Sequence, residues 1–333
     1  MIKKTAVFAL VFTFVISLFA CQREIVPKNR IFYEFFDTVS VVYDYTGGTQ
    51  EDFDRVCELV ERELYECHML YDIYDEYEGD TNIKTLNDRA GQGPVTVDER
   101  IIDLLSFSKE MYELTDGNVN VAMGSVLSIW HRERELGVRV PPMDELIFAS
   151  EHTDITKVII DREAMTVELT DPEMSLDVGA IAKGFTAERI AMMLKEMGIS
   201  GYALDFGGNL RAVGEKPSGD GWVSGIRNPD SLAEEPYVRT VTIKDEALVT
   251  SGTYERFYTV DGVSYHHIIS KDTLMPANEY VSVTVMAPSS ALADALSTAV
   301  FNMSVDEARA LTESLEGIEI TLVTKEGEVL VVS

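Results

Sequence analysis

Two short segments of this chain carry residues whose types and spacing could do chemistry. The first, Asp177–Gly184, reads Asp-Val-Gly-Ala-Ile-Ala-Lys-Gly, which predicts a strand end that turns through Gly179 into a helix with Lys183 in its first turns. The second contains Asp294 and Thr298, whose oxygens share one face if the segment is helical. Hard divalent cations such as Mg²⁺ prefer oxygen ligands and leave room for phosphate oxygens and water. A Lys beside a helix N-terminus suits a pyrophosphate. Together the segments indicate metal-assisted chemistry on a phosphate diester or anhydride.

Each segment also has an ordinary explanation. An Asp followed four residues later by a Thr is common on helix surfaces, where the Asp is solvated and the Thr bonds back to its own helix. The glycine-containing turn fits neither the Walker A spacing nor the dinucleotide-binding fingerprint. The chemical interpretation therefore depends on several such features occurring together.

The N-terminus has the pattern of a secretory signal. Lys3 and Lys4 form a basic start, residues 6–20 are almost wholly apolar, and Cys21 follows Ala20. The apolar run is short for a membrane-spanning helix. A Cys directly after a small residue at the cleavage point resembles the bacterial lipobox, in which the Cys is lipidated and becomes the mature N-terminus.

This pattern predicts three parts. Residues 1–20 form a signal peptide that is removed, residues 21–30 form a tether from lipidated Cys21, and residues 31–333 form the folded domain. The protein is then expected at the extracytoplasmic face of the cell membrane, on the periplasmic side if an outer membrane exists. An uncleaved anchor and a buried N-terminal helix are the alternatives.

Charge and cysteine content narrow the class of protein further. The chain has 28 basic and 57 acidic residues, a formal net charge of −29, which makes nucleic acid an unexpected partner and suits a solvated extracytoplasmic surface. Cys57 and Cys67 lie on one predicted helix, about 15 Å apart, too far for a disulfide with each other. We expect both to be thiols of the core.

The hydrophobic pattern predicts helices and strands interspersed along the chain. Thr96 and Glu99 suggest a capping box at the start of one helix, and Ser304 and Glu307 at the start of another. The predicted helices cover residues 49–72, 96–114, 180–197, 289–301 and 304–315. The predicted strands and hairpins cover residues 31–45, 158–170, 202–206, 210–213, much of 221–285 including a turn at 260–262, and 318–332, with a polar loop after the first helix through residue 93. Because hairpins outnumber parallel units and no long internal linker occurs, we expect one compact α+β domain, largely antiparallel sheet with packed helices.

Taken in order, these features resemble the ApbE family, the FAD:protein FMN transferases. The Asp-Val-Gly-Ala-Ile-Ala-Lys-Gly segment, His-Ile-Ile at residues 267–269 and the downstream Ala-Asp-Ala-Leu-x-Thr are specific when found together. The matching blocks span nearly the whole mature chain: Asp37–Thr38, Asn82–Asn87, Asn118–Trp130, Ser175–Arg189, Asp205–Gly214, Trp222–Pro229, Val249–Arg256, Tyr265–Pro276 and Ser282–Phe301.

The resemblance implies a compact domain with FAD bound in a cleft. Enzymes of this family use Mg²⁺, with Mn²⁺ a possible substitute, to split the pyrophosphate of FAD. They place FMN on a Ser or Thr hydroxyl of a target protein and release AMP, and some members hydrolyse FAD to FMN and AMP. Their targets are membrane-associated electron-transfer subunits and extracytoplasmic flavoproteins with a short Ser/Thr-Gly-Ala-type motif.

The resemblance also implies roles for residues of the two opening segments. Asp294 and Thr298 match the metal ligands of the family, and Ala180 would add its backbone carbonyl. Lys183 matches a Lys that contacts FAD, where its ammonium would stabilise the splitting anhydride and the AMP leaving group. Asp177 matches a further FAD contact.

A catalytic histidine and the flavin contacts are implied in the same way. His267 matches the catalytic His of the family, although His266 precedes it directly and leaves the register open; the Ile-Ile that follows favours His267. An imidazole could take the proton of the attacking hydroxyl or hold that hydroxyl in line. The other expected cofactor contacts are Phe36, one of Tyr74 and Tyr77 as a stacking aromatic, the Ala122-Met123-Gly124 segment, and Ile268.

The chain departs from the family pattern in three places. Phe36-Asp37 replaces Met-Gly, which would alter the packing against the flavin. The segment Ser270–Pro276 replaces the frequent Asp-Pro-x-Thr-Gly-x-Pro, and Asn209 stands where Asp is common. None of these changes removes a proposed metal ligand.

The leading hypothesis is therefore Mg²⁺-dependent transfer of FMN from FAD to a protein hydroxyl. One alternative is a metal-dependent FAD pyrophosphatase with water as the nucleophile. The other is a flavin-binding lipoprotein without catalytic activity.

Overall fold

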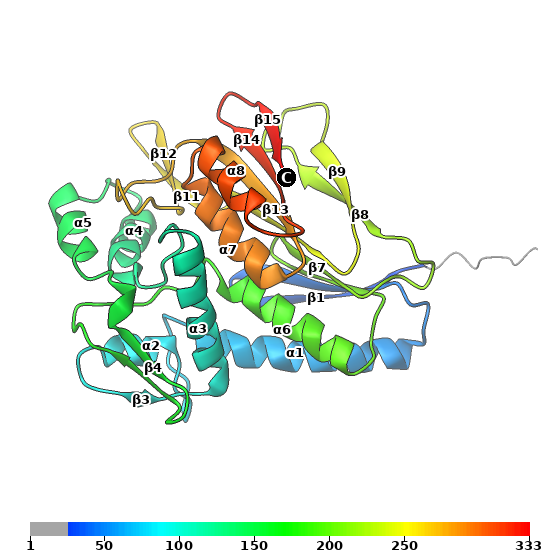
Figure 1. The fold of residues 1–333 in the computed structure, drawn as a ribbon, viewed down its shortest axis with the longest axis horizontal. Helices are drawn as coiled ribbons and strands as arrows, with labels where there is room; N and C mark the ends of the chain where they lie inside the picture. The colour runs from blue at the N-terminus through cyan, green and yellow to red at the C-terminus, as the bar shows by residue number, and fades with distance from the viewer. Residues whose placement is uncertain (1–25) are drawn as a thin grey trace, which may run out of the picture.

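The computed structural model describes residues 26–333 and is organised around one eight-stranded sheet (Figure 1). In spatial order its strands are β1 (Lys28–Phe35), β2 (Thr38–Asp44), β6 (Tyr202–Phe206), β7 (Asn209–Val213), β10 (Ala247–Gly252), β13 (Tyr280–Ala287), β14 (Glu319–Thr324) and β15 (Val329–Val332). All neighbouring strands in this sheet run antiparallel. The predicted α+β class with a largely antiparallel sheet is confirmed.

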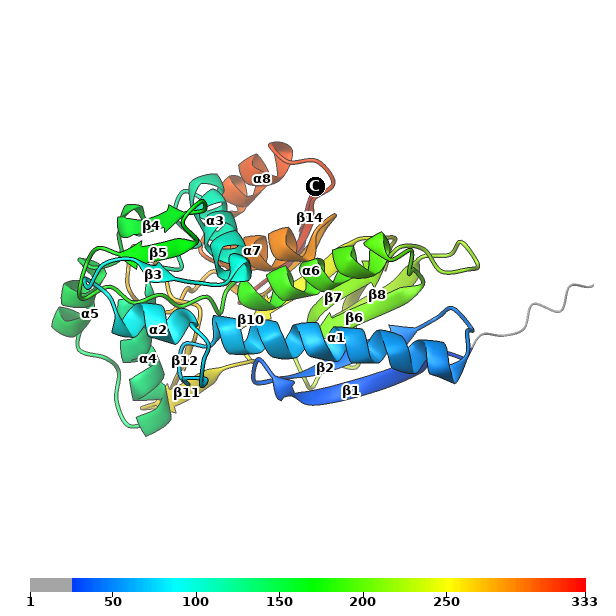
Figure 2. The same cartoon turned by 90° about the horizontal axis from the view of Figure 1, so that it is seen from below.

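Helices cover one face of the sheet. They are α1 (Gln50–Tyr71), α6 (Ala182–Glu196), α7 (Ser290–Phe301) and α8 (Val305–Glu313). The first two lie side by side along the β1–β2–β6 part of the sheet (Figure 2), and their apolar stripes form a shared core with these strands. Helix α7 packs beside α6 and against β10 and β13. This arrangement brings the N-terminal turns of α6 next to the middle of α7.

A hairpin of two strands, β8 (Trp222–Arg227) and β9 (Tyr237–Ile243), covers part of the opposite face. Successive side chains of a strand point to opposite sides of the sheet. Strand β6 has apolar side chains on both sides, so both faces of the sheet must be covered there. Tyr202 and Leu204 pack on the helices, whereas Ala203 packs on the hairpin with Trp222. The central strands are therefore buried on both sides.

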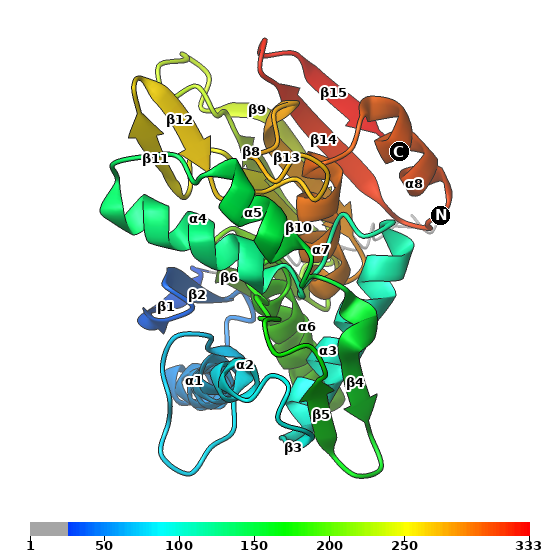
Figure 3. The same ribbon diagram turned by 90° about the vertical axis from the view of Figure 1, so that its left-hand side faces the viewer.

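The remaining elements gather at one end of the sheet (Figure 3). The helices there are α2 (Ile83–Asp88), α3 (Glu99–Leu114), α4 (Gly124–Leu136) and α5 (Met143–Ser150). The strands are β3 (Val95–Thr96), β4 (Val158–Asp161), β5 (Thr166–Leu169), β11 (Phe257–Val260) and β12 (Val263–His266), with a 3₁₀ turn over Ile155–Lys157. Strands β3, β5 and β4 form a small sheet, and β11 pairs with β12.

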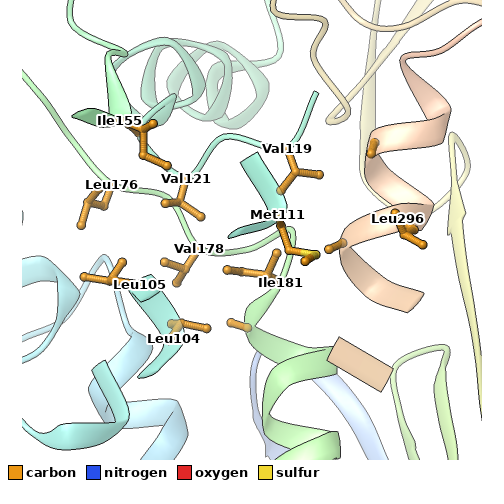
Figure 4. Close-up of a cluster of buried hydrophobic side chains, with 14 of the residues drawn as sticks. Leu104, Leu105, Met111, Val119, Val121, Ile155, Leu176, Val178, Ile181 and Leu296 are labelled. Carbon is orange, nitrogen blue, oxygen red and sulfur yellow. The ribbon is translucent and has the colours of Figure 1, made fainter. Parts of the chain in front are cut away.

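The largest core cluster joins this end to the main sheet. Its centre is made of apolar side chains from α3, from the segments around residues 119–121 and 176–181, and from α7 (Figure 4). Val178 and Ile181 both point into this cluster and are almost fully buried. The segment between them is thereby fixed at both ends, and it carries two of the residues singled out from the sequence.

Several predicted elements are confirmed. Helix α1 begins after Thr49, whose side chain caps it, and ends at Tyr71 as its periodicity predicts. The β6 strand, the α7 and α8 helices, the Ser304–Glu307 capping box and the hairpins over residues 158–170 and 318–332 also agree with the prediction. Cys57 and Cys67 are both buried and free.

Three predictions were wrong. The single strand over residues 31–45 is a hairpin, because Phe36 and Asp37 both adopt left-handed backbone conformations, with φ of 53° and 51°, and turn the chain. Helix α3 is capped by Asp98, since Thr96 belongs to β3. The loop predicted through residue 93 contains α2, capped by Asn82.

The N-terminal predictions fall mostly outside the described part of the chain. Cys21 and the predicted signal peptide over residues 1–20 lie before residue 26. Strand β1 starts at Lys28, so the sheet begins within the last residues assigned to the tether. None of the helices formed by residues 26–333 has both the length and the apolar character needed to cross a bilayer.

Candidate functional site

A cleft of about 490 Å³ collects most of the residues that the sequence singled out. Its wall is built by the β1–β2 turn, the segment after α1, helix α4, the turn that opens α6, the start of β7, helix α7, the end of β10 and the segments after β10 and β12. The predicted residues on this wall are Phe36, Tyr74, Tyr77, Met123, Asp177, Ala180, Lys183, His267, Ile268, Asp294 and Thr298. The volume lies within the range typical of small-molecule sites.

The turn that opens α6 is held by its apolar neighbours and by one carboxylate. Val178 and Ile181 are anchored in the core (Figure 4), so Gly179 and Ala180 between them are left at the cleft. Asp177 Oδ1 accepts a hydrogen bond of 2.9 Å from the Gly179 N–H. The turn therefore presents Ala180 and, one step into the helix, Lys183 to the same space.

Helix α7 contributes a deeply buried carboxylate close to this turn. Asp294 is 4% exposed, and its Oδ2 accepts a hydrogen bond of 2.8 Å from the Gly184 N–H. Burial raises the pKa of the Asp294 carboxyl, and the charge of Lys183 opposes that rise. Thr298 lies one helical turn further along α7 and lines the same cleft. The site thus places a carboxylate, a hydroxyl and an ammonium together.

The contact between α6 and α7 requires that Gly184 have no side chain. A Cβ built on Gly184 would lie 2.4 Å from Asp294 Cβ and 2.4 Å from the Ser290 carbonyl oxygen. Neither atom can swing away, because one belongs to the backbone and the other is attached to it. The glycine therefore sets the close approach of the two helices, and with it the hydrogen bond to Asp294.

We expect Gly184→Ala to destabilise the fold by about 1–3 kcal/mol, the usual cost of overpacking, despite the roughly 1 kcal/mol that Ala contributes in a helix interior. The clash should also displace Asp294 and weaken Mg²⁺ binding. Urea unfolding and the thermal shift produced by Mg²⁺ measure the two effects. Gly48→Ala is the control, because its Cβ would meet only two side-chain oxygens, Thr46 Oγ1 at 3.1 Å and Asp52 Oδ2 at 4.0 Å, and lies away from the cleft. Equal stability and equal Mg²⁺ shifts for Gly184→Ala and the wild type would contradict this prediction.

The donor set fits a hard divalent cation. A carboxylate, a hydroxyl and a backbone carbonyl are the oxygen ligands that Mg²⁺ prefers, and a site with few protein ligands leaves room for phosphate and water. Within residues 26–333 no group of three or more His, Cys, Asp or Glu side chains could hold a metal ion, so a soft or carboxylate-rich site is not present there. Asn209 also lines the cleft, and its buried Oδ1 has no hydrogen-bond partner there.

The two adjacent histidines have different surroundings. His266 is buried, with Nε2 donating to the Ala277 carbonyl at 2.8 Å and Nδ1 accepting from the Ile268 N–H at 3.2 Å. Both of its nitrogens are therefore used by the backbone. His267 lines the cleft, and its Nδ1 lies 3.2 Å from the Arg256 carbonyl, to which it must donate. This leaves Nε2 of His267 as an acceptor.

Burial, followed by the charge of Arg256, lowers the pKa of His267 to about 3. In the unfolded chain a His titrates near pH 6.5. As the pH falls from about 6.5 towards 3, the unfolded chain binds a proton that the folded chain does not, so His267 makes the fold less stable over that window. We expect His267→Gln to lose less stability than the wild type between pH 7.5 and pH 5.0, as urea midpoints would measure. A larger loss for the variant would contradict the expected sign.

Only some of the expected flavin contacts face the cleft. Phe36, Tyr74, Tyr77 and Met123 line the cleft. Ala122 is fully buried behind the wall, and Gly124 packs directly on the backbone at Ser175. Of the Ala122-Met123-Gly124 segment, only Met123 therefore faces the cavity.

The sequence analysis missed several residues on the same wall, notably His131, Arg134, Asn118 and Asn120 from α4 and the segment before it, with Arg256 after β10. His131 contacts both Tyr74 and Asp177, which were predicted as cofactor contacts. The sequence held one signal for it, because His131 directly follows a block that resembles the family. Its partners lie 57 and 46 residues away, so no spacing pattern could reveal the contact.

Comparisons with known proteins all lead to one family. A model described as the ApbE family matches residues 38–322. An FAD:protein FMN transferase of Treponema pallidum is 36% identical over 255 residues, which cover 72% of this chain and 70% of that protein. An FAD:protein FMN transferase of Klebsiella pneumoniae is 31% identical over 280 residues and covers 84% of each chain.

Solved structures give the same result at the level of the fold. The ApbE protein of Thermotoga maritima superposes with a TM-score of 0.81 at 27% identity, covering 92% of this chain and 97% of that one. A flavin transferase ApbE from Vibrio cholerae superposes with a TM-score of 0.78 at 24% identity, covering 92% and 98%.

Proposed function

The chain belongs to the ApbE family, and we propose that it transfers FMN from FAD to a Ser or Thr hydroxyl of target flavoproteins and releases AMP. FAD:protein FMN transferase activity follows from relatives that are 31–36% identical over most of the chain. The observation that carries the proposal is the buried Asp294 carboxylate, held by the Gly184 N–H beside Lys183 and one turn from Thr298 on the wall of a cleft.

A divalent cation, Mg²⁺ or Mn²⁺, would be held by Asp294, Thr298 and the Ala180 carbonyl. When bound, it supplies charge neutralisation at the diphosphate of FAD. This contribution is needed because the Asp294 carboxylate would otherwise repel the diphosphate. Lys183 supplies the permanent positive charge at the same place, and its position in the first turn of α6 adds the favourable end of the helix dipole.

The transfer then exchanges one phosphorus–oxygen bond for another. The acceptor hydroxyl oxygen attacks the phosphorus of the FMN half, and the bond from that phosphorus to the bridging oxygen breaks, so that AMP leaves with the bridging oxygen. His267 accepts the proton of the hydroxyl at Nε2, which its Nδ1 contact with Arg256 leaves free. Burial keeps this imidazole neutral, and an incoming diphosphate would make it a stronger base through its negative charge. Lys183 stabilises the charge that collects on the departing AMP.

The acceptors and the location of the enzyme are part of the same proposal. Membrane electron-transfer subunits with a Ser/Thr-Gly-Ala-type motif are the expected targets, reached from the extracytoplasmic face of the membrane by an enzyme anchored through Cys21. The support for the anchor is the signal and lipobox pattern of residues 1–21. The support for an exposed extracytoplasmic domain is its acidic, solvated character.

The test is an intact-mass measurement on a protein that carries such a motif, after incubation with this enzyme, FAD and Mg²⁺. We expect a covalent increase equal to FMN minus water, with one AMP released for each FMN transferred. A Ser/Thr→Ala substitution in the acceptor motif is the control. Rapid release of AMP and FMN without acceptor would favour the pyrophosphatase alternative, and FAD binding without any product would favour the non-catalytic alternative.

A further inference from the structure

We propose that His131 is a positioning residue that holds Tyr74 at the wall of the cleft, against the isoalloxazine ring of FAD, and ties it to the turn that presents Ala180. This inference rests on the proposed function, in which FAD is the substrate, and it adds a residue that positions the flavin half of that substrate. Neither the sequence pattern nor the resemblance assigns a role to His131.

The first contact is between the segment after α1 and helix α4. The Tyr74 hydroxyl lies 2.9 Å from His131 Nδ1, and the centroids of the two rings are 6.1 Å apart. Tyr74 is 55% exposed, so little else restrains its ring. Tyr77, by contrast, donates its hydroxyl to Asp72 Oδ2 at 2.8 Å within its own segment. Of the two candidate stacking aromatics, Tyr74 is the one whose hydroxyl contacts a different element of the cleft wall, helix α4.

The second contact leads from His131 to the turn before α6. His131 Nε2 lies 3.8 Å from Asp177 Oδ2, and the other oxygen of Asp177 accepts the Gly179 N–H at 2.9 Å. The His131 and Asp177 side chains are 19% and 10% exposed, so their attraction is only weakly screened by solvent. A continuous chain of polar contacts thus runs from Tyr74 to the backbone next to Ala180.

Electrostatics select one tautomer for His131. Burial lowers the pKa of His131 and raises the pKa of Tyr74 to about 12, so both groups are neutral near pH 7. A lone pair on Nε2 would face the Asp177 carboxylate and be repelled, so the proton belongs on Nε2. Nδ1 is then an acceptor, and the Tyr74 hydroxyl donates to it. The Asp177 carboxylate thus determines which group donates and which accepts in each of these contacts.

This arrangement restricts the motion of an aromatic side chain that would otherwise be free to leave the cleft. Ordering Tyr74 before FAD arrives removes part of the entropy cost of binding the flavin. A hydrogen bond of this kind is worth about a three- to tenfold change in affinity. The same series of polar contacts ends at the Gly179 N–H. Loss of His131 should therefore also loosen the turn that carries Ala180.

The experiment compares variants of the full folded domain by their affinity for FAD. His131→Leu removes both ring nitrogens, Tyr74→Phe removes the donor, and His131→Asn keeps a polar atom near the place of Nδ1. Tyr33→Phe is the matched control, because Tyr33 is an exposed tyrosine on β1 that does not line the cleft. Titration of FAD, followed by quenching of flavin fluorescence by the stacked ring, gives the Kd and a spectroscopic signature of stacking.

We expect His131→Leu and Tyr74→Phe each to raise the Kd for FAD about three- to tenfold and to reduce the quenching, with no further loss in the double variant. His131→Asn should recover part of the affinity, and Tyr33→Phe should bind as the wild type. Wild-type affinity and quenching for His131→Leu, or additive losses in the double variant, would overturn the inference. If the wild type transfers no FMN while the variants still differ from it in FAD affinity as expected, the proposed function alone is overturned. If the wild type binds no FAD, both the proposed function and this inference are overturned.

Discussion

Replacing Asp294 by Ala is expected to reduce FAD-dependent AMP release at least about 1,000-fold. The proposed cation site has one carboxylate. Its loss would remove the charge that a divalent cation needs to remain at the diphosphate, an effect worth several kcal/mol of transition-state stabilisation. Asp294 is buried against Gly184 and near Lys183, and within residues 26–333 no group of three or more His, Cys, Asp or Glu side chains offers another metal site. Steady-state AMP release with saturating Mg²⁺ measures the effect.

Stability separates this loss from simple unfolding. Burial raises the pKa of Asp294, which means that its charged form is costly in the fold when no cation is bound. Asp294→Asn keeps the shape of the side chain and an acceptor for the Gly184 N–H. We expect it to be as inactive as Asp294→Ala, to unfold at an equal or higher temperature than the cation-free wild type, and to lose the stabilisation by Mg²⁺. AMP release that persists unchanged in either variant would show that the cation is held elsewhere.

Replacing His267 by Gln is expected to lower the rate of FMN transfer about 100- to 10,000-fold, the usual contribution of a positioned general base. Gln can keep a donor toward the Arg256 carbonyl, but it cannot accept and carry a proton as Nε2 does. The loss should appear in kcat, with the Kd for FAD changed little, because the base acts on the acceptor hydroxyl. Transfer to a motif-bearing acceptor, followed by intact mass over time, measures it.

The neighbouring histidine provides the matched control. His266 has both nitrogens bonded to the backbone at Ala277 and Ile268, so His266→Gln should lower the unfolding temperature while the folded protein keeps most of its activity. If His266→Gln instead lost the transfer reaction and His267→Gln kept it, the catalytic register would be shifted by one residue.

The sequence predicted those parts of the fold in which local pattern and tertiary packing agree. Helix α1 has a capping Thr49 and an apolar stripe, and α7 has Ser289 as its cap followed by a nearly continuous apolar run, so both were found close to their observed limits. The closing hairpin of β14 and β15 was found for the same reason, since a glycine-containing turn separates two apolar strands.

The failures occurred where tertiary contacts decide the local conformation. Phe36 and Asp37 make a tight turn with positive φ at both positions, although the sequence has no Gly or Asn there to signal it. The turn is held because Phe36 packs on His68, with ring centroids 5.5 Å apart, and because Phe35 is buried in the core. Helix α2 has six residues, too few for a helical period to stand out from a polar segment.

The site could be predicted only in part for a similar reason. The spacing of Asp294 and Thr298 on one helix follows from sequence, but the approach of Gly184 to Asp294, 110 residues away, does not. The resemblance to a family implied that the two segments meet at one cation, but it did not predict the contact with Gly184. It gave no information on His131, which lies one residue beyond a matching block and acts through partners distant in sequence.

Anomalous diffraction from crystals of the protein soaked with Mn²⁺ and FAD tests the central claim most directly. We predict one Mn²⁺ peak within bonding distance of an Asp294 carboxylate oxygen, Thr298 Oγ1 and the Ala180 carbonyl oxygen, with diphosphate oxygens of FAD completing its coordination and Lys183 beside them. A peak at another place, or a diphosphate bound away from α7, would contradict the account.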